Sequence, residues 1–161
     1  MKRTLFLLML VQVISLPVNG QGNILDKFIG RWEAKGKSFN LLSETSMTWE
    51  TALSGKFIRL TYRIVMHPAQ GNDQVFEGEA LYKISGGNSL TATWFDSQGA
   101  VHPISATSTE TTLTSLWGTS ATSQGKTIYT LKEDGTMELE DYILTKNGEW
   151  RQFNHGVFNR K

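Results

Sequence analysis

Short runs of alternating polar and apolar residues follow one another along this chain from about residue 21 to its end. There are about ten such runs, rich in β-branched and aromatic residues, and each ends at a turn rich in Gly, Asn or Ser. No long stretch with helical spacing interrupts them. This pattern predicts an all-β fold, an antiparallel meander that closes into a barrel or a sandwich.

The N-terminal residues differ from the rest and predict a targeting segment. A basic start, Met1-Lys2-Arg3, precedes an almost wholly apolar run from Thr4 to Leu16, and small residues follow near position 20. We interpret residues 1–20 as a secretory signal peptide, cleaved between Gly20 and Gln21. The apolar run is too short to span a bilayer comfortably, which needs about 20 residues. Residues 21–161 then form one exported domain, in the periplasm or the extracellular space.

The composition argues against several classes of function. Lys and Arg number 16 against 15 Asp and Glu, and no basic cluster stands outside the predicted signal peptide, which argues against a nucleic-acid partner. The chain has no Cys, which excludes disulfides, Cys-based metal sites and Cys nucleophiles. The three His residues are scattered without the spacing of a metal site, and no nucleophile elbow occurs.

Turn residues divide the mature chain into one helical turn and ten strands. The helical turn lies within Gln21 to Ile29, where apolar residues recur at helical spacing. The expected strands span residues 31–39, 45–52, 57–67, 74–84, 90–96, 101–108, 112–119, 126–131, 137–144 and 150 to the end.

Alternation within the strands predicts which side chains face the interior. In the strand at residues 57–67, Ile58, Leu60 and Tyr62 share one face, and Arg59 and Arg63 share the other. A barrel of about ten strands encloses more space than small residues fill, so we expect a cavity for a mostly apolar ligand. The small residues predicted inside are Gly36, Gly78, Ala80 and Ala92. The alternative is that bulky Trp and Tyr side chains fill the interior.

Three short stretches carry a resemblance to a known superfamily. Phe28-Ile29-Gly30-Arg31-Trp32 is similar to the G-x-W opening of calycins, the superfamily of lipocalins and fatty-acid-binding proteins. With Trp94-Phe95-Asp96-Ser97-Gln98-Gly99 and the ending Phe158-Asn159-Arg160-Lys161, the chain resembles a family of secreted calycin-like proteins distantly related to the haem-binding nitrobindins. We therefore expect a single calycin-like, up-and-down β-barrel. Only residues 40–44 separate the first two expected strands, which leaves no room for the helical lid of fatty-acid-binding proteins.

The resemblance also implies structural roles for particular residues. Trp32, preceded by Gly30, would close the base of the barrel, and Arg160 on the last strand would pack across it. Asp96 and Gly99 would shape a tight hairpin, because Asp and Ser side chains cap the backbone of such turns.

Our leading hypothesis is a non-catalytic, lipocalin-like carrier or sensor for a small, largely apolar molecule, without a cofactor. Aromatic side chains would supply most of the contact with the ligand, and we expect these to be Trp32, Tyr62, Tyr82, Trp94 and Trp117. Two predicted inner positions are polar, Ser115 and Asp141, and they would orient a polar group of the ligand. Alternatively, Asp141 pairs with Arg151 or a Tyr hydroxyl, or lies at the rim.

Three other functions stay open. A haem-binding barrel would use His155 as the iron ligand, as the resemblance to nitrobindins implies, but alternation from Arg160 places His155 outside unless a β-bulge intervenes. An enzyme would act on an apolar substrate through Asp141 and a Tyr, which requires Asp141 to be buried, unpaired by Arg and directed at the cavity. An interaction module would present a contiguous apolar patch on its outer face, around Val65, Val75 and Leu81.

Overall fold

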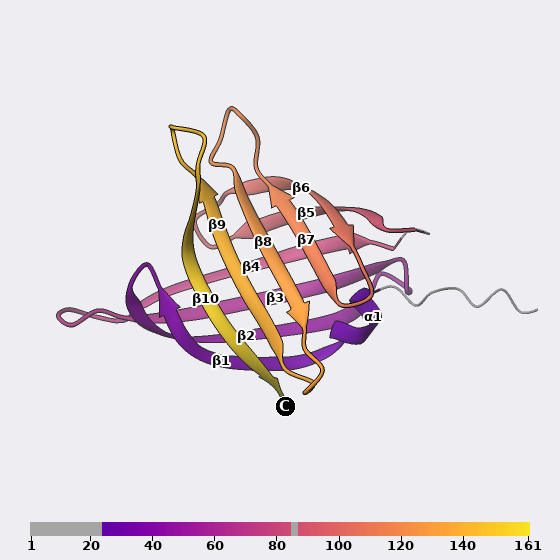
Figure 1. Cartoon of the computed structure of the whole chain (residues 1–161), viewed down its shortest axis with the longest axis horizontal. Coiled ribbons are helices and arrows are strands. Elements are labelled where there is room, and N and C mark those ends of the chain that lie inside the picture. Colours follow the sequence, from indigo (N-terminus) through magenta and orange to yellow (C-terminus); the bar gives the residue numbers. More distant parts are fainter. Residues whose placement is uncertain (1–23, 85–86) are drawn as a thin grey trace, which may run out of the picture.

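The computed structural model describes residues 24–84 and 87–161, so the predicted signal peptide lies outside the described residues. Within them, ten antiparallel strands form one closed barrel, and one short helix, α1 (Ile24–Phe28), precedes the first strand (Figure 1). This confirms the predicted all-β barrel with its N-terminal helical turn. The strands are β1 (Gly30–Ser38), β2 (Leu41–Ala52), β3 (Phe57–His67), β4 (Gln74–Lys83), β5 (Ser89–Asp96), β6 (Val101–Ser108), β7 (Thr112–Trp117), β8 (Gly125–Leu131), β9 (Met137–Leu144) and β10 (Trp150–Arg160).

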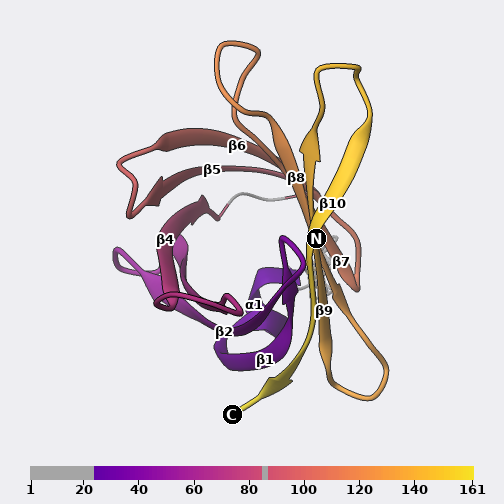
Figure 2. The ribbon, with the colours of Figure 1, turned by 90° about the vertical axis from the view of Figure 1, so that its left-hand side faces the viewer.

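The strands pair in sequence order, and pairing of β1 with β10 closes the barrel. At this seam Trp32 lies opposite Arg160. In Figure 1, β7–β10 cross in front of β1–β4 at a steep angle, and Figure 2 shows the curved wall with α1 inside its outline. Closure gives every described strand a partner on both sides, which protects a disulfide-free barrel from edge-to-edge aggregation.

The connection between β1 and β2 is shorter than the expected one at residues 40–44. It is a two-residue turn at Phe39 and Asn40, whose φ angles are 49° and 64°. Positive φ at both central residues is the geometry of a type I′ hairpin turn, which Asn favours and Phe rarely adopts. Phe39 is held there by stacking on Phe153 of β10, with ring centroids 4.7 Å apart. The prediction was wrong here because Phe is not a turn signal.

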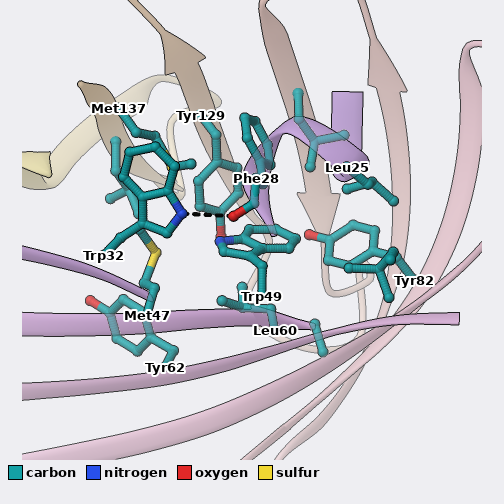
Figure 3. Close-up of a cluster of buried hydrophobic side chains, with 14 of the residues drawn as sticks. Leu25, Phe28, Trp32, Met47, Trp49, Leu60, Tyr62, Tyr82, Tyr129 and Met137 are labelled. Carbon is teal, nitrogen blue, oxygen red and sulfur yellow. Dashed lines mark hydrogen bonds between the residues drawn. The ribbon is translucent and has the colours of Figure 1, made fainter. Parts of the chain in front are cut away.

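The core is tightly packed at the end of the barrel that α1 closes. The side chains of Leu25 and Phe28 are fully buried. The ring of Phe28 packs against Trp49 and Tyr129, with centroids 5.2 and 6.0 Å away. The carbonyl oxygen of Phe28 accepts a hydrogen bond of 2.7 Å from Trp32 Nε1 (Figure 3). The helix is therefore a plug whose apolar face completes the core.

Arg160 covers the same end of the barrel. Its guanidinium lies 4.4 Å from the centroid of the Trp32 ring, a cation–π arrangement. It also donates hydrogen bonds of 2.5 Å to the carbonyl oxygens of Ile29 and Lys27. Gly30 has a φ of 129°, and a Cβ at this position would come within 3.1 Å of Arg160 Nη1. A glycine here lets the guanidinium reach the backbone between α1 and β1.

Candidate functional site

The barrel interior is hollow at the end opposite α1. The cavity there has a volume of about 410 Å³, within the range of roughly 300–1,000 Å³ that small-molecule sites occupy. Its wall includes residues next to the β1–β2, β3–β4, β5–β6 and β7–β8 turns, which surround the mouth. The aliphatic part of the wall consists of Leu60, Ile64, Met66, Val75, Ile104, Leu139 and Ile143. The interior is therefore filled at one end and open at the other.

The structure brings most of the predicted ligand-contacting residues to this cavity. Its wall includes Tyr62, Tyr82, Trp94, Ser115, Trp117 and Asp141. Trp32 does not line it. The Trp32 side chain is fully buried at the α1 end, where it contacts Phe28 and Arg160.

Two of the tryptophans lie flat over glycines on the neighbouring strands. A Cβ added at Gly78 would come within 2.1 Å of the Trp94 ring, and one added at Gly125 within 1.8 Å of the Trp117 ring. The space expected beside Gly78 is therefore occupied by Trp94 rather than free for a ligand. The same packing presses both indoles against the wall.

Asp96 shapes the β5–β6 turn at the rim of the cavity. Its Oδ1 accepts hydrogen bonds from the backbone N–H groups of Gln98 (2.9 Å) and Ala100 (3.0 Å). Gly99, with a φ of 83°, takes the left-handed position in this turn. Trp94 Nε1 lies 3.4 Å from Asp96 Oδ2, which ties the turn to the cavity wall.

The centre of the cavity wall is a polar cluster around Asp141. Asp141 Oδ1 accepts a hydrogen bond of 2.5 Å from Thr127 Oγ1, and Oδ2 accepts one of 2.7 Å from Asn154 Nδ2. Thr127 in turn accepts from Trp117 Nε1 at 3.2 Å, and Asn154 Nδ2 lies 3.4 Å from Tyr62 Oη. The partners of Asp141 are thus neutral side chains, not Arg151 or a Tyr hydroxyl.

Burial sets the protonation states in this cluster. It raises the pKa of Asp141 to about 6, although the hydrogen bonds from Thr127 and Asn154 oppose the shift. Burial also raises the pKa of Tyr82 to about 12, against the effect of its 2.9 Å hydrogen bond with Ser115. The pKa of Tyr62 is raised further, by burial and then by the charge of Asp141. The cavity therefore combines one carboxyl group that titrates near pH 6 with hydroxyl groups that stay protonated.

Several cavity residues were not singled out from the sequence. Thr127 and Tyr129 alternate inward along β8, so strand periodicity was the signal that could have found them. His102 was expected at an edge or turn before Pro103, but it lies within β6 and lines the cavity. Its ring packs 5.8 Å from that of Trp117, and its Nδ1 is buried without a hydrogen-bond partner.

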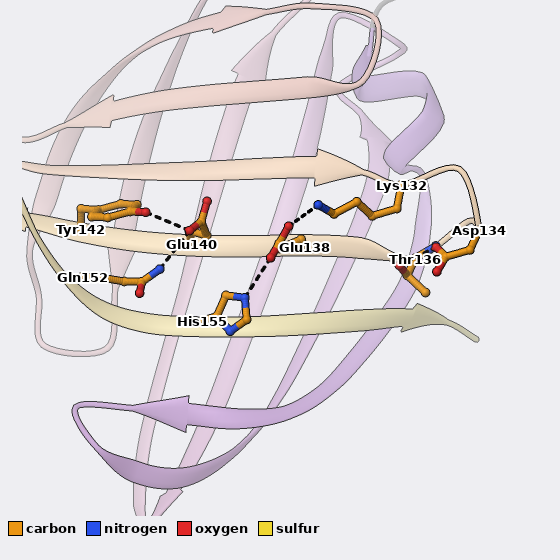
Figure 4. A network of polar contacts seen from close by, with 8 residues as sticks. All are labelled: Lys132, Asp134, Thr136, Glu138, Glu140, Tyr142, Gln152 and His155. Atoms are coloured by element: carbon orange, nitrogen blue, oxygen red, sulfur yellow. Dashed lines mark hydrogen bonds and ion pairs between the residues drawn. The ribbon is translucent and has the colours of Figure 1, made fainter.

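His155 lies on the outer face of β10, as alternation from Arg160 predicted. Its Nε2 is 3.0 Å from Glu138 Oε1, and Glu138 also pairs with Lys132 (Figure 4). The irregularity in β10 falls between Gln152 and Asn154, before His155, so it leaves the orientation of His155 unchanged. A haem inside the barrel would have no ligand from His155, and this residue does not fit that role.

The outer face of β1–β4 carries many charged side chains. Val75 is half exposed, but Glu77 and Glu79 separate it from Leu81 along β4, and Glu77 pairs with Arg63 at 3.1 Å. The apolar patch expected there is therefore interrupted. An open groove of about 550 Å³ also crosses the outer face of β1–β3 and β10, and its lining includes the ion-paired side chains of Arg31, Glu33, Lys35, Glu44 and Arg63.

Comparison with known proteins gives no family assignment: no protein-family model matches the chain, and no curated protein matches it significantly. The closed ten-stranded antiparallel barrel of the described residues is compatible with a calycin-like fold. In the described part of the chain, no helix is both long and apolar enough to cross a membrane. The functional assignment therefore depends on the cavity and its chemistry.

Proposed function

We propose that the protein is an exported, calycin-like carrier that holds a small, largely apolar molecule inside the barrel without transforming it. One observation carries the proposal: a cavity of about 410 Å³ opens at one end of a closed barrel and combines aromatic walls with a single buried polar cluster. Export rests on the signal-peptide pattern of residues 1–20.

The composition of the wall supports binding of an apolar molecule. Aromatic and aliphatic side chains supply most of the contact surface, and contact with them releases water from both partners. The polar groups are few and are fixed by hydrogen bonds to one another, which orients a ligand without filling the space. The packed α1 end anchors this wall on a rigid base.

A second candidate, an enzyme that acts on an apolar substrate, is favoured by the environment of Asp141. This carboxyl group is buried, lines the cavity and is hydrogen-bonded to Thr127 and Asn154 rather than to an Arg. A proton-transfer mechanism needs a second titrating group near the substrate. Tyr62 and Tyr82 do not supply a base, because burial holds their pKa values above the ordinary range. His102 also lines the cavity, but its ring packs on Trp117, and no hydrogen bond among the described residues joins it to Asp141. A carrier function therefore accounts for the site better than catalysis does.

Native mass spectrometry of the mature chain, purified after export without added ligand, tests the proposal. We expect a reproducible mass excess of a small organic molecule. A haem-sized excess with a Soret band would favour the haem alternative instead. A protein without a mass excess is then titrated with N-phenyl-naphthylamine, a neutral probe that fluoresces in apolar sites.

Two variants locate the bound molecule. Ile143→Trp fills part of the cavity and should weaken probe binding by about tenfold or more. Leu116→Trp adds the same ring on the outer face of β7, where Leu116 is half exposed, and should leave binding unchanged. An apo mass together with no probe binding, or equal effects of the two variants, would contradict an interior carrier.

A further inference from the structure

We propose that the cavity selects apolar molecules that carry a protonated amine, whose ammonium group pairs with Asp141 among the surrounding aromatic rings. This inference rests on the proposed function, because it requires a ligand inside the barrel. It adds a prediction of the ligand's charge, which follows neither from the fold nor from the cavity volume.

The charges on the cavity wall give the first argument. The acidic residues that line it are Asp96 and Asp141, and none of the described lining residues is Lys or Arg. Asp96 lies at the rim and already accepts two backbone hydrogen bonds, whereas Asp141 is only 9% exposed. Apart from His102, a ligand carboxylate would find no side chain on the described wall that can carry a positive charge, and it would face the like charge of Asp141. An ammonium group would find the opposite charge of the Asp141 carboxylate.

The hydrogen bonds of Asp141 give the second argument. Each carboxylate oxygen accepts one hydrogen bond, from Thr127 and from Asn154. An ionised carboxylate offers about four acceptor positions, so each oxygen keeps one for another donor. Thr127 and Asn154 also fix the orientation of the carboxylate, and a bound donor therefore meets a preorganised acceptor. A primary ammonium group supplies such donors together with the charge that neutralises Asp141.

The aromatic walls give the third argument. The rings of Tyr62 and Trp94 lie 6.2 Å apart and nearly edge to face, and Phe76 stacks with Trp94 at 6.3 Å. The charge of Asp141 contributes to the raised pKa values of Tyr62, Tyr82 and Tyr129, so all three side chains lie within its electrostatic reach. Faces of Tyr and Trp rings attract cations, most strongly where water is excluded. The carboxylate and the rings therefore favour the same kind of ligand group.

A matched series of probes tests this selectivity by isothermal titration calorimetry at pH 7.5. Phenylbutylamine, phenylbutanol and phenylbutyrate share one apolar body and differ in the charge of the head group. The wild-type protein should bind the amine at least about tenfold more tightly than the alcohol, and the carboxylate at least about tenfold more weakly. This ranking needs no variant, so it remains a test even where a variant fails to fold.

Two isosteric variants then assign the preference to Asp141. Asp141→Asn should abolish the preference for the amine and keep the affinity for the alcohol within about threefold. Asp73→Asn removes the same charge from an exposed residue beside the β3–β4 turn, where Asp73 pairs with His67, and should preserve the wild-type ranking. A preference that Asp141→Asn retains, or that Asp73→Asn loses, would overturn the role of Asp141.

The outcomes separate the two proposals. If the alcohol binds as tightly as the amine, or the carboxylate binds best, the inferred selectivity is wrong while the carrier function stands. If none of the three probes binds the wild-type protein and N-phenyl-naphthylamine does not bind either, the carrier function itself is wrong.

Discussion

Asp141 is a carboxyl group in surroundings that disfavour its charge. Its partners Thr127 and Asn154 are neutral, so they satisfy its oxygens without neutralising it. The consequence is a pKa raised from 3.8 to about 6, with burial as the main cause. Such a residue reduces stability at neutral pH, which is common where a side chain serves binding rather than folding.

The shift of Asp141 predicts how stability depends on pH. Between about pH 4 and pH 6 the folded protein binds more protons at this site than the unfolded protein, so the contribution of Asp141 to the free energy of unfolding falls as the pH rises. Asp141→Asn removes this dependence. The free energy of unfolding of the wild type minus that of the variant should fall by about 2 kcal/mol from pH 4 to pH 7. Urea unfolding followed by Trp fluorescence measures it.

Glu138 is a matched control with the opposite sign. Lys132 and His155 lower its pKa, so it stabilises the folded state above its unfolded pKa of about 4.5, and this contribution is lost as the pH falls. The free energy of unfolding of the wild type minus that of Glu138→Gln should therefore rise with pH. If the free energy of unfolding of the wild type minus that of Asp141→Asn also rose with pH, the inference that the Asp141 carboxylate is buried would be wrong.

At the scale of strands, the wall of the cavity depends on pairs of a large and a very small residue. Ala80 lies opposite Trp94 in the register of β4 and β5, and the Trp94 indole covers the neighbouring Gly78. Trp117 lies opposite Gly125 in β7 and β8 and covers it in the same way. Each glycine gives up side-chain packing of its own so that an indole can lie flat against the sheet.

This packing predicts a specific sensitivity at Gly78. Gly78→Ala places a Cβ about 2.1 Å from the Trp94 ring, which forces the indole into the cavity. We expect a loss of about 1–3 kcal/mol in the free energy of unfolding, measured with urea, together with weaker probe binding. In a Trp94→Leu background the same substitution should cost much less, because the clash is gone. Equal costs in both backgrounds would show that the indole does not cause the sensitivity.

The elements that could be predicted from the sequence are those in which alternation and turn residues agree. The bounds of β3, β6 and β9 match expectation, because each run of alternation is bounded by polar turn residues. The turn at Phe39 and the indole over Gly78 were missed, since both depend on a neighbour far away in sequence, Phe153 and Trp94. Asp141 was predicted to face inward. Its partners Thr127 and Asn154 were not identified, because the sequence of one strand does not show its register with the neighbouring strands.

At the scale of the whole molecule, the barrel has two ends with different physical character. At the α1 end, large side chains such as Trp32, Trp49 and Phe158 are fully buried and in contact. At the open end, the same strands surround the cavity and its polar cluster. Stability follows buried apolar contact, so local opening should be easier at the open end.

Hydrogen exchange measures this difference within single strands. In β3, amides near Ile58 lie at the α1 end and amides near Met66 lie at the cavity mouth, and all of them belong to the same paired strand. Amides of residues 57–59 should exchange at least about tenfold more slowly than those of residues 64–67. Addition of phenylbutylamine should slow exchange of the second group and leave the first unchanged, because a ligand stabilises only the conformations that bind it. Uniform protection along β3, or an equal effect of ligand at both ends, would contradict this division, in which the α1 end stabilises the fold and the open end binds the ligand.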